Sequence, residues 1–424
     1  MQIAAAAFGS IPSQHQEVRW SGYVPLNASR CRAPRPDDPL PLATPPRVGI
    51  LGGSVSYGRM EYGEDCSYSE ILWRALNATI LNFAMPATGA AQASLCMGSW
   101  LPTEPPVDVL VLEFAINDAL GLHSGVGSGQ KSTTALKGAP KIDHLSSMER
   151  ILRHALLHWP RTTVVILHVC PPGRAGLACE QIDAPVLELY QAYGVHLVSL
   201  MQDVAPATAK RIYFTNVVHP NGEGHAAIAQ LLRKTIAEAA GPARQPAAEL
   251  PRPRWDNATE SDGAWRCRSC LDKPCSALPP TTADGFSIGA RHGLLSELYW
   301  FATRQGAAAA WVLGAGTRQV VLGFTCSYAH MGAAAVAIVP VGEVPRARDE
   351  QHVELLWEHR SSQHCLVALG RVPPGPHALH IRVTSNRTDA APATASRALR
   401  EHAANQVQLF GVFEQVDSGI DVLL

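Results

Sequence analysis

The chain has 424 residues, of which 46% are hydrophobic and 17% are charged, and its formal net charge is −1. This length favours two domains, and the composition is typical of a packed globular protein. A net charge near zero argues against nucleic acids and anionic membranes as partners, because both require clustered basic surface. No apolar run reaches the roughly 18 residues that span a bilayer, so no membrane-spanning segment is expected.

The compartment is predicted from sequons and cysteines. The N-terminal stretch lacks a basic start and a long apolar segment, so it makes a poor signal peptide, and whether the N-terminus is complete stays open. Ten cysteines and four sequons nevertheless favour the secretory pathway or the extracellular space. The sequons begin at Asn27, Asn77, Asn257 and Asn386.

The first 240 residues change character at residue 46. Residues 1–45 are rich in Pro and Arg and are interpreted as an irregular lead-in. From 46 to 240, apolar runs alternate with helical stretches, which predicts a parallel sheet covered by helices on both faces. The expected strands are 48–51, 79–84, 107–114, 162–168 and 195–200, and the expected helices are 68–76, one starting near Gly89, 144–158, 182–193 and 222–239.

The remaining chain has a different pattern. Residues 241–285 are rich in Pro and Cys and are interpreted as a linker. Residues 286–424 contain short β-type runs separated by Gly, Pro and polar turns, which predicts a β-sandwich. The runs are 318–325, 333–339, 352–357, 364–369, 377–384 and 406–414.

Three polar motifs of the first domain carry candidate chemistry. Ser54 follows the first strand directly, Asn117 follows the third, and His219 precedes the last helix. A serine hydroxyl needs a base to accept its proton, and His219 is the candidate. A tetrahedral intermediate needs hydrogen-bond donors, and the candidates are the N–H groups of Ser54 and Gly89 and the Asn117 amide.

Each residue taken alone has a structural interpretation. Ser54 suits an ordinary turn, and Asn221 suits a helix cap. Asp118 is expected to be a cap or a structural hydrogen-bonding group, and His225 a buried structural histidine. An active site is favoured because all the motifs occur in this order at matching ends of one sheet.

The four blocks resemble those of the SGNH hydrolases, also called the GDSL-type lipase/esterase superfamily. Its characteristic Ser, Gly, Asn and His match Ser54, Gly89, Asn117 and His219. The runs GGSVSYG, NFAMPATGAAQASLC and VLEFAIND are similar to a eukaryotic subgroup from algae, plants and fungi, which includes proteins similar to capsule-associated fungal factors. LGFTCSYAHMG, residues 322–332, looks like the C-terminal β-domain of its plant and algal members.

The resemblance implies a three-layer α/β/α flavodoxin-like SGNH domain over 46–240, followed by a β-sandwich-like domain. It also implies a serine esterase acting on small acyl groups, such as O-acetyl groups on polysaccharide, with neither cofactor nor metal. Two alternatives stay open: an O-acyltransferase with the same site, or a catalytically degenerate carbohydrate-binding or cell-wall assembly protein. The α/β-hydrolase scaffold is disfavoured, because Ser56 occupies the second Gly position of its Gly-x-Ser-x-Gly turn.

Two positions depart from the family pattern. Gly53 stands where the family usually has Asp, although the subgroup often has Gly there. Asn216 stands three residues before the histidine, where the family has Asp. An amide can orient the imidazole but cannot stabilise its positive charge as a carboxylate does. Asn216 therefore predicts reduced or dyad-type hydrolysis, or drift toward acyl transfer or a non-catalytic role, unless a backbone carbonyl or Asp203 substitutes.

The cysteine spacing Cys267-x2-Cys270-x4-Cys275 suits either zinc or disulfides. A disulfide-stapled linker is favoured, because only three thiols lie close together and no second CxxC follows. The other expectations are a local disulfide between Cys170 and Cys179 and free, buried thiols at Cys96 and Cys326.

Overall fold

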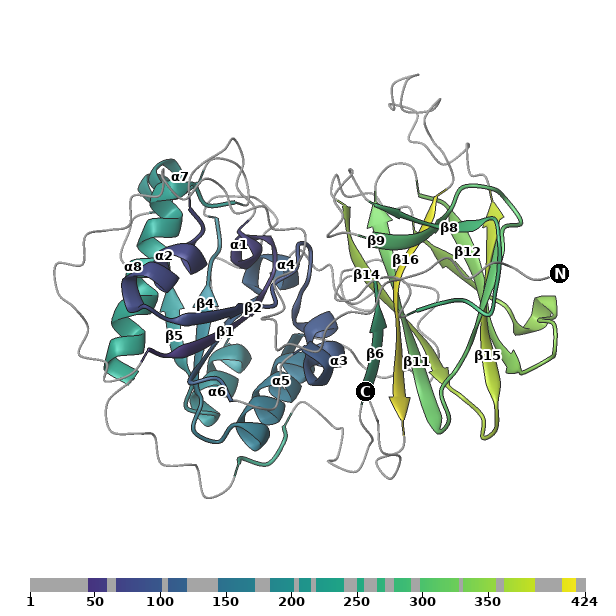
Figure 1. Ribbon diagram of the computed structural model, residues 1–424, viewed down its shortest axis with the longest axis horizontal. Coiled ribbons are helices and arrows are strands. Elements are labelled where there is room, and N and C mark those ends of the chain that lie inside the picture. The colour runs from purple at the N-terminus through teal and green to yellow at the C-terminus, as the bar shows by residue number, and fades with distance from the viewer. Residues whose placement is uncertain are drawn as a thin grey trace, which may run out of the picture.

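A computed structural model of the protein has an α/β domain and a β-rich domain packed side by side (Figure 1). The structure describes residues 45–58, 66–100, 106–119, 144–171, 184–201, 206–214, 219–239, 250–254, 265–270, 278–290, 298–327, 331–355, 362–385 and 406–416. Within these residues, no helix combines the length and the apolar character that crossing a bilayer requires.

The α/β domain is built on five parallel strands in the order β2-β1-β3-β4-β5. The bounds are Arg47–Gly52 for β1, Thr79–Asn82 for β2, Val109–Glu113 for β3, Thr163–His168 for β4 and His196–Ser199 for β5. Every residue of β3 and β4 is buried, as their apolar sequences predict. The strand order is that of flavodoxin-like folds, which confirms the predicted fold class.

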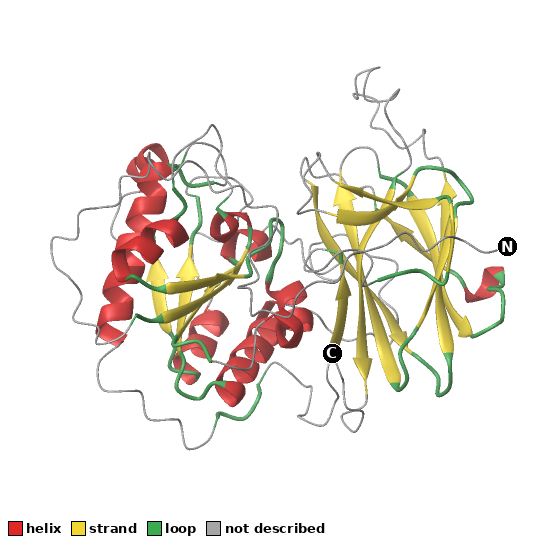
Figure 2. Ribbon diagram, viewed as in Figure 1, coloured by secondary structure: helices red, strands yellow, loops and turns green. Residues whose placement is uncertain are grey.

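Helices cover both faces of this sheet (Figure 2). Leu110 and Leu112 of β3 face α3, α5 and α6, whereas Val109 and Val111 face α2 and α8. The helices are α1 Ser54–Tyr57, α2 Tyr68–Leu76, α3 Ala90–Trp100, α4 Ala115–Ala119, α5 His144–His158, α6 Ala184–Ala192, α7 Pro206–Tyr213 and α8 Gly222–Ala239. Successive side chains of β3 thus point alternately into two apolar cores, one on each face of the sheet. This is the three-layer arrangement that the sequence predicts.

The β-rich domain consists of two antiparallel sheets. One has the order β13-β12-β15-β10-β7, and the other has the order β14-β11-β16-β9-β8 with β6 paired to β16. Their bounds are β6 Trp265–Ser269, β7 Thr282–Asp284, β8 Phe286–Ala290, β9 Leu298–Ala302, β10 Ala308–Val312, β11 Thr317–Ser327, β12 Ala333–Pro340, β13 Gln351–Glu354, β14 Ser362–Arg371, β15 His377–Ser385 and β16 Val407–Val416. An apolar core that includes Trp311, Phe324 and Ile381 fills the space between the sheets, so the predicted β-sandwich is confirmed.

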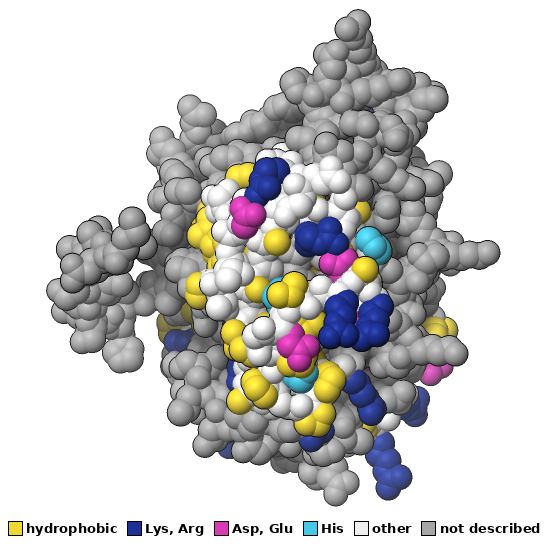
Figure 3. Space-filling view, turned by 90° about the vertical axis from the view of Figure 1, so that its right-hand side faces the viewer, with side chains coloured by type: hydrophobic (Ala, Val, Ile, Leu, Met, Phe, Trp, Pro, Cys, Tyr) yellow, Lys and Arg dark blue, Asp and Glu magenta, His cyan; other side chains and the backbone are white. Residues whose placement is uncertain are grey.

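The β13-β12-β15-β10-β7 sheet presents its second face to solvent. Basic, acidic and apolar side chains are interspersed on this side of the molecule (Figure 3). Arg382 pairs with Glu350 at 2.5 Å, and Arg304 pairs with Asp284 at 2.7 Å. This face is therefore a solvated surface, and ion pairs on such a surface contribute little to stability.

The β14-β11-β16-β9-β8 sheet differs, because the α/β domain packs against its second face and leaves the edge strand β8 exposed. Along β14, Cys365 and Val367 point into the sandwich, while Leu366 and Ala368 join the apolar cluster of α3 and α5. Phe410 of β16 belongs to the same cluster. The two domains therefore share one hydrophobic core across their junction.

A disulfide also joins the domains. Cys96 of α3 is bonded to Cys267 of β6, 171 residues away, with 5.0 Å between the Cα atoms. The expectation of a free thiol at Cys96 is therefore wrong: the thiol is buried, but it lies where β6 crosses α3. β6 itself falls inside the segment interpreted as a linker, and Arg266 and Arg268 beside Cys267 both pair with the buried Glu414 of β16.

The other cysteines are consistent with this pattern. All cysteines whose side chains the structure describes are in disulfides, including Cys170 and Cys270. The predicted partner Cys179 and the third cluster residue Cys275 lie outside the described residues, as does the side chain of Cys326.

Candidate active site

The turn after β1 exposes Ser54 at the carboxyl edge of the parallel sheet. In the order β2-β1-β3-β4-β5 the connections reverse direction between β1 and β3, and open α/β sheets bind ligands at such a point. Ser54 follows β1 as the first residue of α1, with Gly53 as its N-cap. The Gly53 N–H donates to the Glu113 backbone carbonyl at 3.1 Å, which anchors the turn to the end of β3.

His219 lies within hydrogen-bonding distance of this serine. The distance from Ser54 Oγ to His219 Nε2 is 2.9 Å, so the imidazole is placed to accept the hydroxyl proton. His219 stands just before α8, whose N-terminus is capped because Asn221 Oδ1 accepts from the Gly224 N–H at 2.8 Å. The Asn221 N–H donates to the Tyr213 carbonyl at 2.8 Å, which ties the segment that carries His219 to the end of α7.

Asn117, in α4 after β3, brings its amide to the same turn. One N–H of Asn117 Nδ2 donates to the Thr88 carbonyl at 2.7 Å, and the amide has a second N–H to offer. The amide lies so close to Gly53 that a Cβ at that position would stand 1.9 Å from Asn117 Nδ2. Glycine before the serine therefore has a direct reason here: a larger residue displaces the Asn117 amide.

Gly89 precedes α3 at the same edge of the sheet. Asp118 Oδ1 accepts from the Ala90 N–H at 3.0 Å, and Asp118 also contacts His144 Nδ1. Asp118 is thus a cap and a structural hydrogen-bonding group, as predicted. Among the described residues, no acceptor is found for the N–H groups of Gly89 and Ser54, which leaves both at helix N-termini that favour negative charge.

Glu113 is a site residue that the sequence motifs did not single out. It ends β3 fully buried, and its Oε2 accepts from the Gly53 N–H at 3.3 Å and from Ser56 Oγ at 3.1 Å. Ser56 Oγ is also 2.6 Å from Tyr68 OH. Burial raises the pKa of Glu113 to about 8, so the carboxyl is largely neutral at pH 7. The available signal was one acidic residue at the end of a strand buried on both faces.

His225 has the structural role that was expected for it. Its side chain is fully buried in α8, and its Nδ1 accepts from the Tyr68 N–H at 3.3 Å. Burial, with a smaller contribution from the charge of His219, lowers the pKa of His225 to about 4. A neutral ring at physiological pH suits a residue that holds α2 against α8.

The two residues predicted to orient the His219 ring are not described by the structure. Asn216 and its possible substitute Asp203 lie outside the described residues, so the orientation of the His219 ring by either stays a prediction. Among the described residues, no group of three side chains is arranged to hold a metal ion.

The arrangement combines a serine, a histidine and three hydrogen-bond donors in one place. Ser54 and His219 are a candidate nucleophile and a candidate base in direct contact. The Asn117 amide and the two helix N-termini place donors around the serine, where a negatively charged oxygen would form. This set of groups suits acyl transfer from an ester.

Comparison with known proteins agrees with this chemistry. Residues 50–227 match the family model described as GDSL-like Lipase/Acylhydrolase family. In structure the chain is similar to a two-domain esterase (CEX) active on acetylated mannans, co-crystallised with mannopentaose, with a TM-score of 0.58 and 14% sequence identity over 88% of this chain and 91% of that one. A second crystal structure described as a two-domain esterase (CEX) active on acetylated mannans gives a TM-score of 0.55 and 15% identity over the same shares of the two chains. No curated protein matches the sequence. At these identities the structural likeness shows a shared two-domain fold.

Proposed function

Since this protein belongs to the GDSL-like lipase/acylhydrolase family and is a carboxylic ester hydrolase, we propose that it removes small acyl groups through an acyl-enzyme formed on Ser54. The observation that carries the proposal is the 2.9 Å contact between Ser54 Oγ and His219 Nε2 at the carboxyl edge of the parallel sheet. We further propose O-acetyl groups on a polysaccharide as the substrate.

In the first half-reaction, Ser54 Oγ attacks the ester carbonyl carbon while His219 Nε2 takes its proton. The carbonyl oxygen becomes an oxyanion, which accepts hydrogen bonds from the N–H groups of Ser54 and Gly89 and from the Asn117 amide. Collapse of this intermediate breaks the ester C–O bond. The departing alcohol oxygen takes the proton from His219, and the acyl group stays on Ser54.

The second half-reaction restores the enzyme. His219 accepts a proton from water as the water oxygen attacks the acyl carbon, and the same donors stabilise the second oxyanion. The bond to Ser54 Oγ then breaks, the serine recovers its proton from His219, and the carboxylic acid leaves. An acyltransferase would differ only in replacing this water with an acceptor hydroxyl.

The substrate proposal is supported by the likeness to an esterase active on acetylated mannans, which shares both domains with this chain. A secretory location is supported by the disulfides, because such bonds persist in oxidising compartments. It is also supported by the exposed side chain of Asn77, a sequon residue at the C-cap of α2.

The proposal is tested by labelling with a fluorophosphonate probe and by assaying acetate release from p-nitrophenyl acetate and acetylated mannan. We expect wild type to label and to release acetate, and Ser54→Ala to lose labelling and at least about 10³-fold in kcat. Ser287→Ala is the matched control, because this serine is exposed on β8 of the other domain; it should behave as wild type.

Labelling that survives in Ser54→Ala, or absence of labelling and turnover in wild type, contradicts the proposal. Absence of both would favour a catalytically degenerate carbohydrate-binding protein. Acetate that appears on an added sugar acceptor instead of in solution would identify the acyltransferase.

A further inference from the structure

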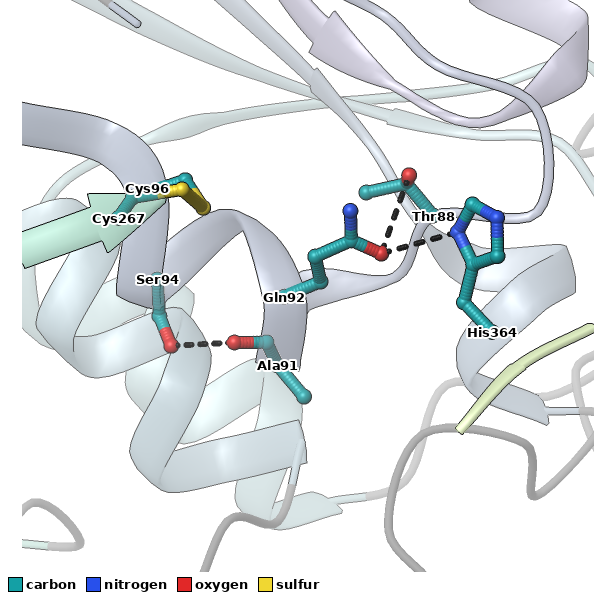
Figure 4. Close-up of a disulfide and its surroundings, with 7 residues drawn as sticks. All are labelled: Thr88, Ala91, Gln92, Ser94, Cys96, Cys267 and His364. Carbon is teal, nitrogen blue, oxygen red and sulfur yellow. Dashed lines mark hydrogen bonds between the residues drawn. A yellow bond between two sulfur atoms is a disulfide. The ribbon is translucent and has the colours of Figure 1, made fainter. Parts of the chain in front are cut away.

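Helix α3 is the element through which the β-rich domain meets the proposed active site. Its first turn follows Gly89, and one of its faces packs on the β14-β11-β16-β9-β8 sheet. Gln92 and Cys96 lie four residues apart and so share a face of this helix. Figure 4 shows both directed toward the β-rich domain, Cys96 to its disulfide partner Cys267 and Gln92 to His364.

A series of hydrogen bonds runs from His364 to the oxyanion donors. His364 Nδ1 is 3.1 Å from Gln92 Oε1, and Thr88 Oγ1 donates to the same oxygen at 3.4 Å. The carbonyl of Thr88 in turn accepts from Asn117 Nδ2 at 2.7 Å. Thr88 is also the neighbour of Gly89, so it lies between two of the three proposed donors.

These groups are shielded from water. His364 is 4% exposed, and Gln92 and Thr88 are each 1% exposed. Hydrogen bonds between buried polar groups are costly to break without replacement, because the partner left behind stays unsatisfied. The series is therefore a fixed part of the junction between the domains.

The β-rich domain also sets the direction of the His364 hydrogen bond. An amide carbonyl oxygen only accepts, so the proton toward Gln92 Oε1 lies on His364 Nδ1. Tyr299 OH is 3.3 Å from the other ring nitrogen, and the imidazole lies 4.2 Å from the Phe410 ring between centroids. Tyr299 and Phe410 thus hold the ring and its proton in place.

We propose that His364 is a positioning residue for ester hydrolysis, acting from the β-rich domain through Gln92 and Thr88 on the Asn117 amide. This inference rests on the proposed function of Ser54 and adds a requirement to it. The β-rich domain is then part of the catalytic unit, whatever it binds on its own. The hydrogen bonds of His364 lead to Thr88 and Asn117, so its proposed effect falls on the stabilisation of the oxyanion.

The test compares four variants in the full chain with p-nitrophenyl acetate. His364→Ala removes the donor to Gln92 and should lower kcat about 10-fold or more, with KM changed less than about 2-fold, because a small misplacement of a transition-state donor is costly. His364→Asn places an amide N–H near the position of Nδ1 and should recover most of the loss. His364→Gln places its amide near Nε2 and should not.

His377→Ala is the matched control. His377 is a buried histidine of the same domain, and its Nδ1 contacts the Gly375 carbonyl at 3.0 Å within its own turn. It should keep the wild-type kcat. Thermal melts of all variants verify folding, and the Asn and Gln variants keep the comparison decisive if His364→Ala does not fold.

Equal kcat in wild type and in His364→Ala or His364→Gln overturns the inference and leaves the proposed function intact. Equal losses in the Asn and Gln variants also overturn it, since they mean that only packing matters. An inactive wild type, by contrast, overturns the proposed function and this inference together.

Discussion

The parallel sheet of the α/β domain and the β14-β11-β16-β9-β8 sheet of the β-rich domain both have apolar clusters on two faces, yet they differ in how they reach the site. Parallel strands end at one edge, so Ser54 after β1 and Asn117 after β3 meet there. Neighbouring antiparallel strands end at opposite edges. The second sheet therefore reaches the site from its face, through His364 of β14. In the proposed mechanism it contributes support, whereas the first sheet contributes the reactive groups.

The two buried carboxylates show the same difference. Glu414 of β16 pairs with Arg266 and Arg268, as a buried charge in a supporting sheet requires. Glu113 of β3 instead receives hydrogen bonds from the Gly53 N–H, from the Ser56 hydroxyl and from the Ser56 backbone. It is kept largely neutral next to the turn that carries Ser54, the proposed nucleophile, whereas Glu414 of β16 pairs with arginines of the neighbouring strand β6.

The largest effect on activity is expected from Gly53→Ala, which disturbs the hydrogen-bond donors at the carboxyl edge of the parallel sheet. The backbone of Gly53, at φ −89° and ψ −151°, accepts alanine, but the new Cβ would stand 1.9 Å from Asn117 Nδ2. Displacing the amide should lower kcat/KM by about 10²- to 10³-fold, the effect of losing an oxyanion donor. Steady-state kinetics on p-nitrophenyl acetate measure this.

Gly98→Ala is the control for this substitution. Gly98 is exposed in α3, and its Cβ would meet nothing closer than 3.7 Å, so the variant should keep full activity and gain about 0.5–1 kcal/mol of helix stability. Wild-type kinetics in Gly53→Ala would mean that the Asn117 amide does not serve the reaction.

A smaller effect is expected from cutting the covalent link between the domains. The double substitution Cys96→Ala with Cys267→Ala removes a bond that closes a 171-residue separation, and it should lower the free energy of unfolding by about 3 kcal/mol. Chemical denaturation measures the change. Because the shared apolar cluster remains, kcat at 25 °C should fall less than in His364→Ala.

Ser94→Ala serves as its control, since Ser94 lies on the same helix and loses only a local hydrogen bond of 2.8 Å to the Ala91 carbonyl. It should cost about 1 kcal/mol. If the double cysteine variant is no less stable than Ser94→Ala, the junction is held by its apolar contacts alone.

A further prediction is a pH dependence of stability caused by Glu113. Its pKa is raised from 4.5 to about 8 in the folded protein, so the folded state holds a proton that the unfolded state releases between these values. The free energy of unfolding therefore falls as pH rises from about 4.5 to about 8, by at most about 1.4 kcal/mol per pH unit for this group. Glu113→Gln should remove that slope.

Denaturation curves from pH 5 to 9 measure the slope, with Glu188→Gln as the control on an exposed glutamate of α6. The free energy of unfolding of Glu113→Gln, relative to that of wild type, should increase with pH. If the free energies of unfolding of wild type and Glu113→Gln change with pH in parallel, Glu113 titrates at its ordinary pKa.

The sequence alone predicted the elements whose signals are local. Helix 68–76 was placed with its observed bounds, and it carries a capping box of Ser67 and Glu70. The parallel strands were found because each contains a short, largely apolar run, most clearly in the buried strands β3 and β4. Strands β6 to β10 were missed: β6 carries two arginines and pairs with β16, more than 130 residues later by the sequence numbering.

The site residues, like the secondary-structure elements, were predicted from sequence only where their signal is local. Ser54, Asn117 and His219 were selected from short motifs, and the structure brings the first and last of them into contact. Gln92 and His364 were not, because they come together only when α3 packs on β14, 272 residues further along the chain. Cys96 was misjudged for the same reason, since its partner is set by the packing of two domains.

The central place of β16 has a consequence for synthesis. This strand pairs with β11, β9 and β6, and its Phe410 fills the junction with α3. A ribosome finishes residues 407–416 long after the α/β domain has emerged, and domains made first fold first. The α/β domain therefore folds while the apolar face of α3 is still uncovered, and the sheet proposed to support Asn117 is completed only after residues 407–416 have been made.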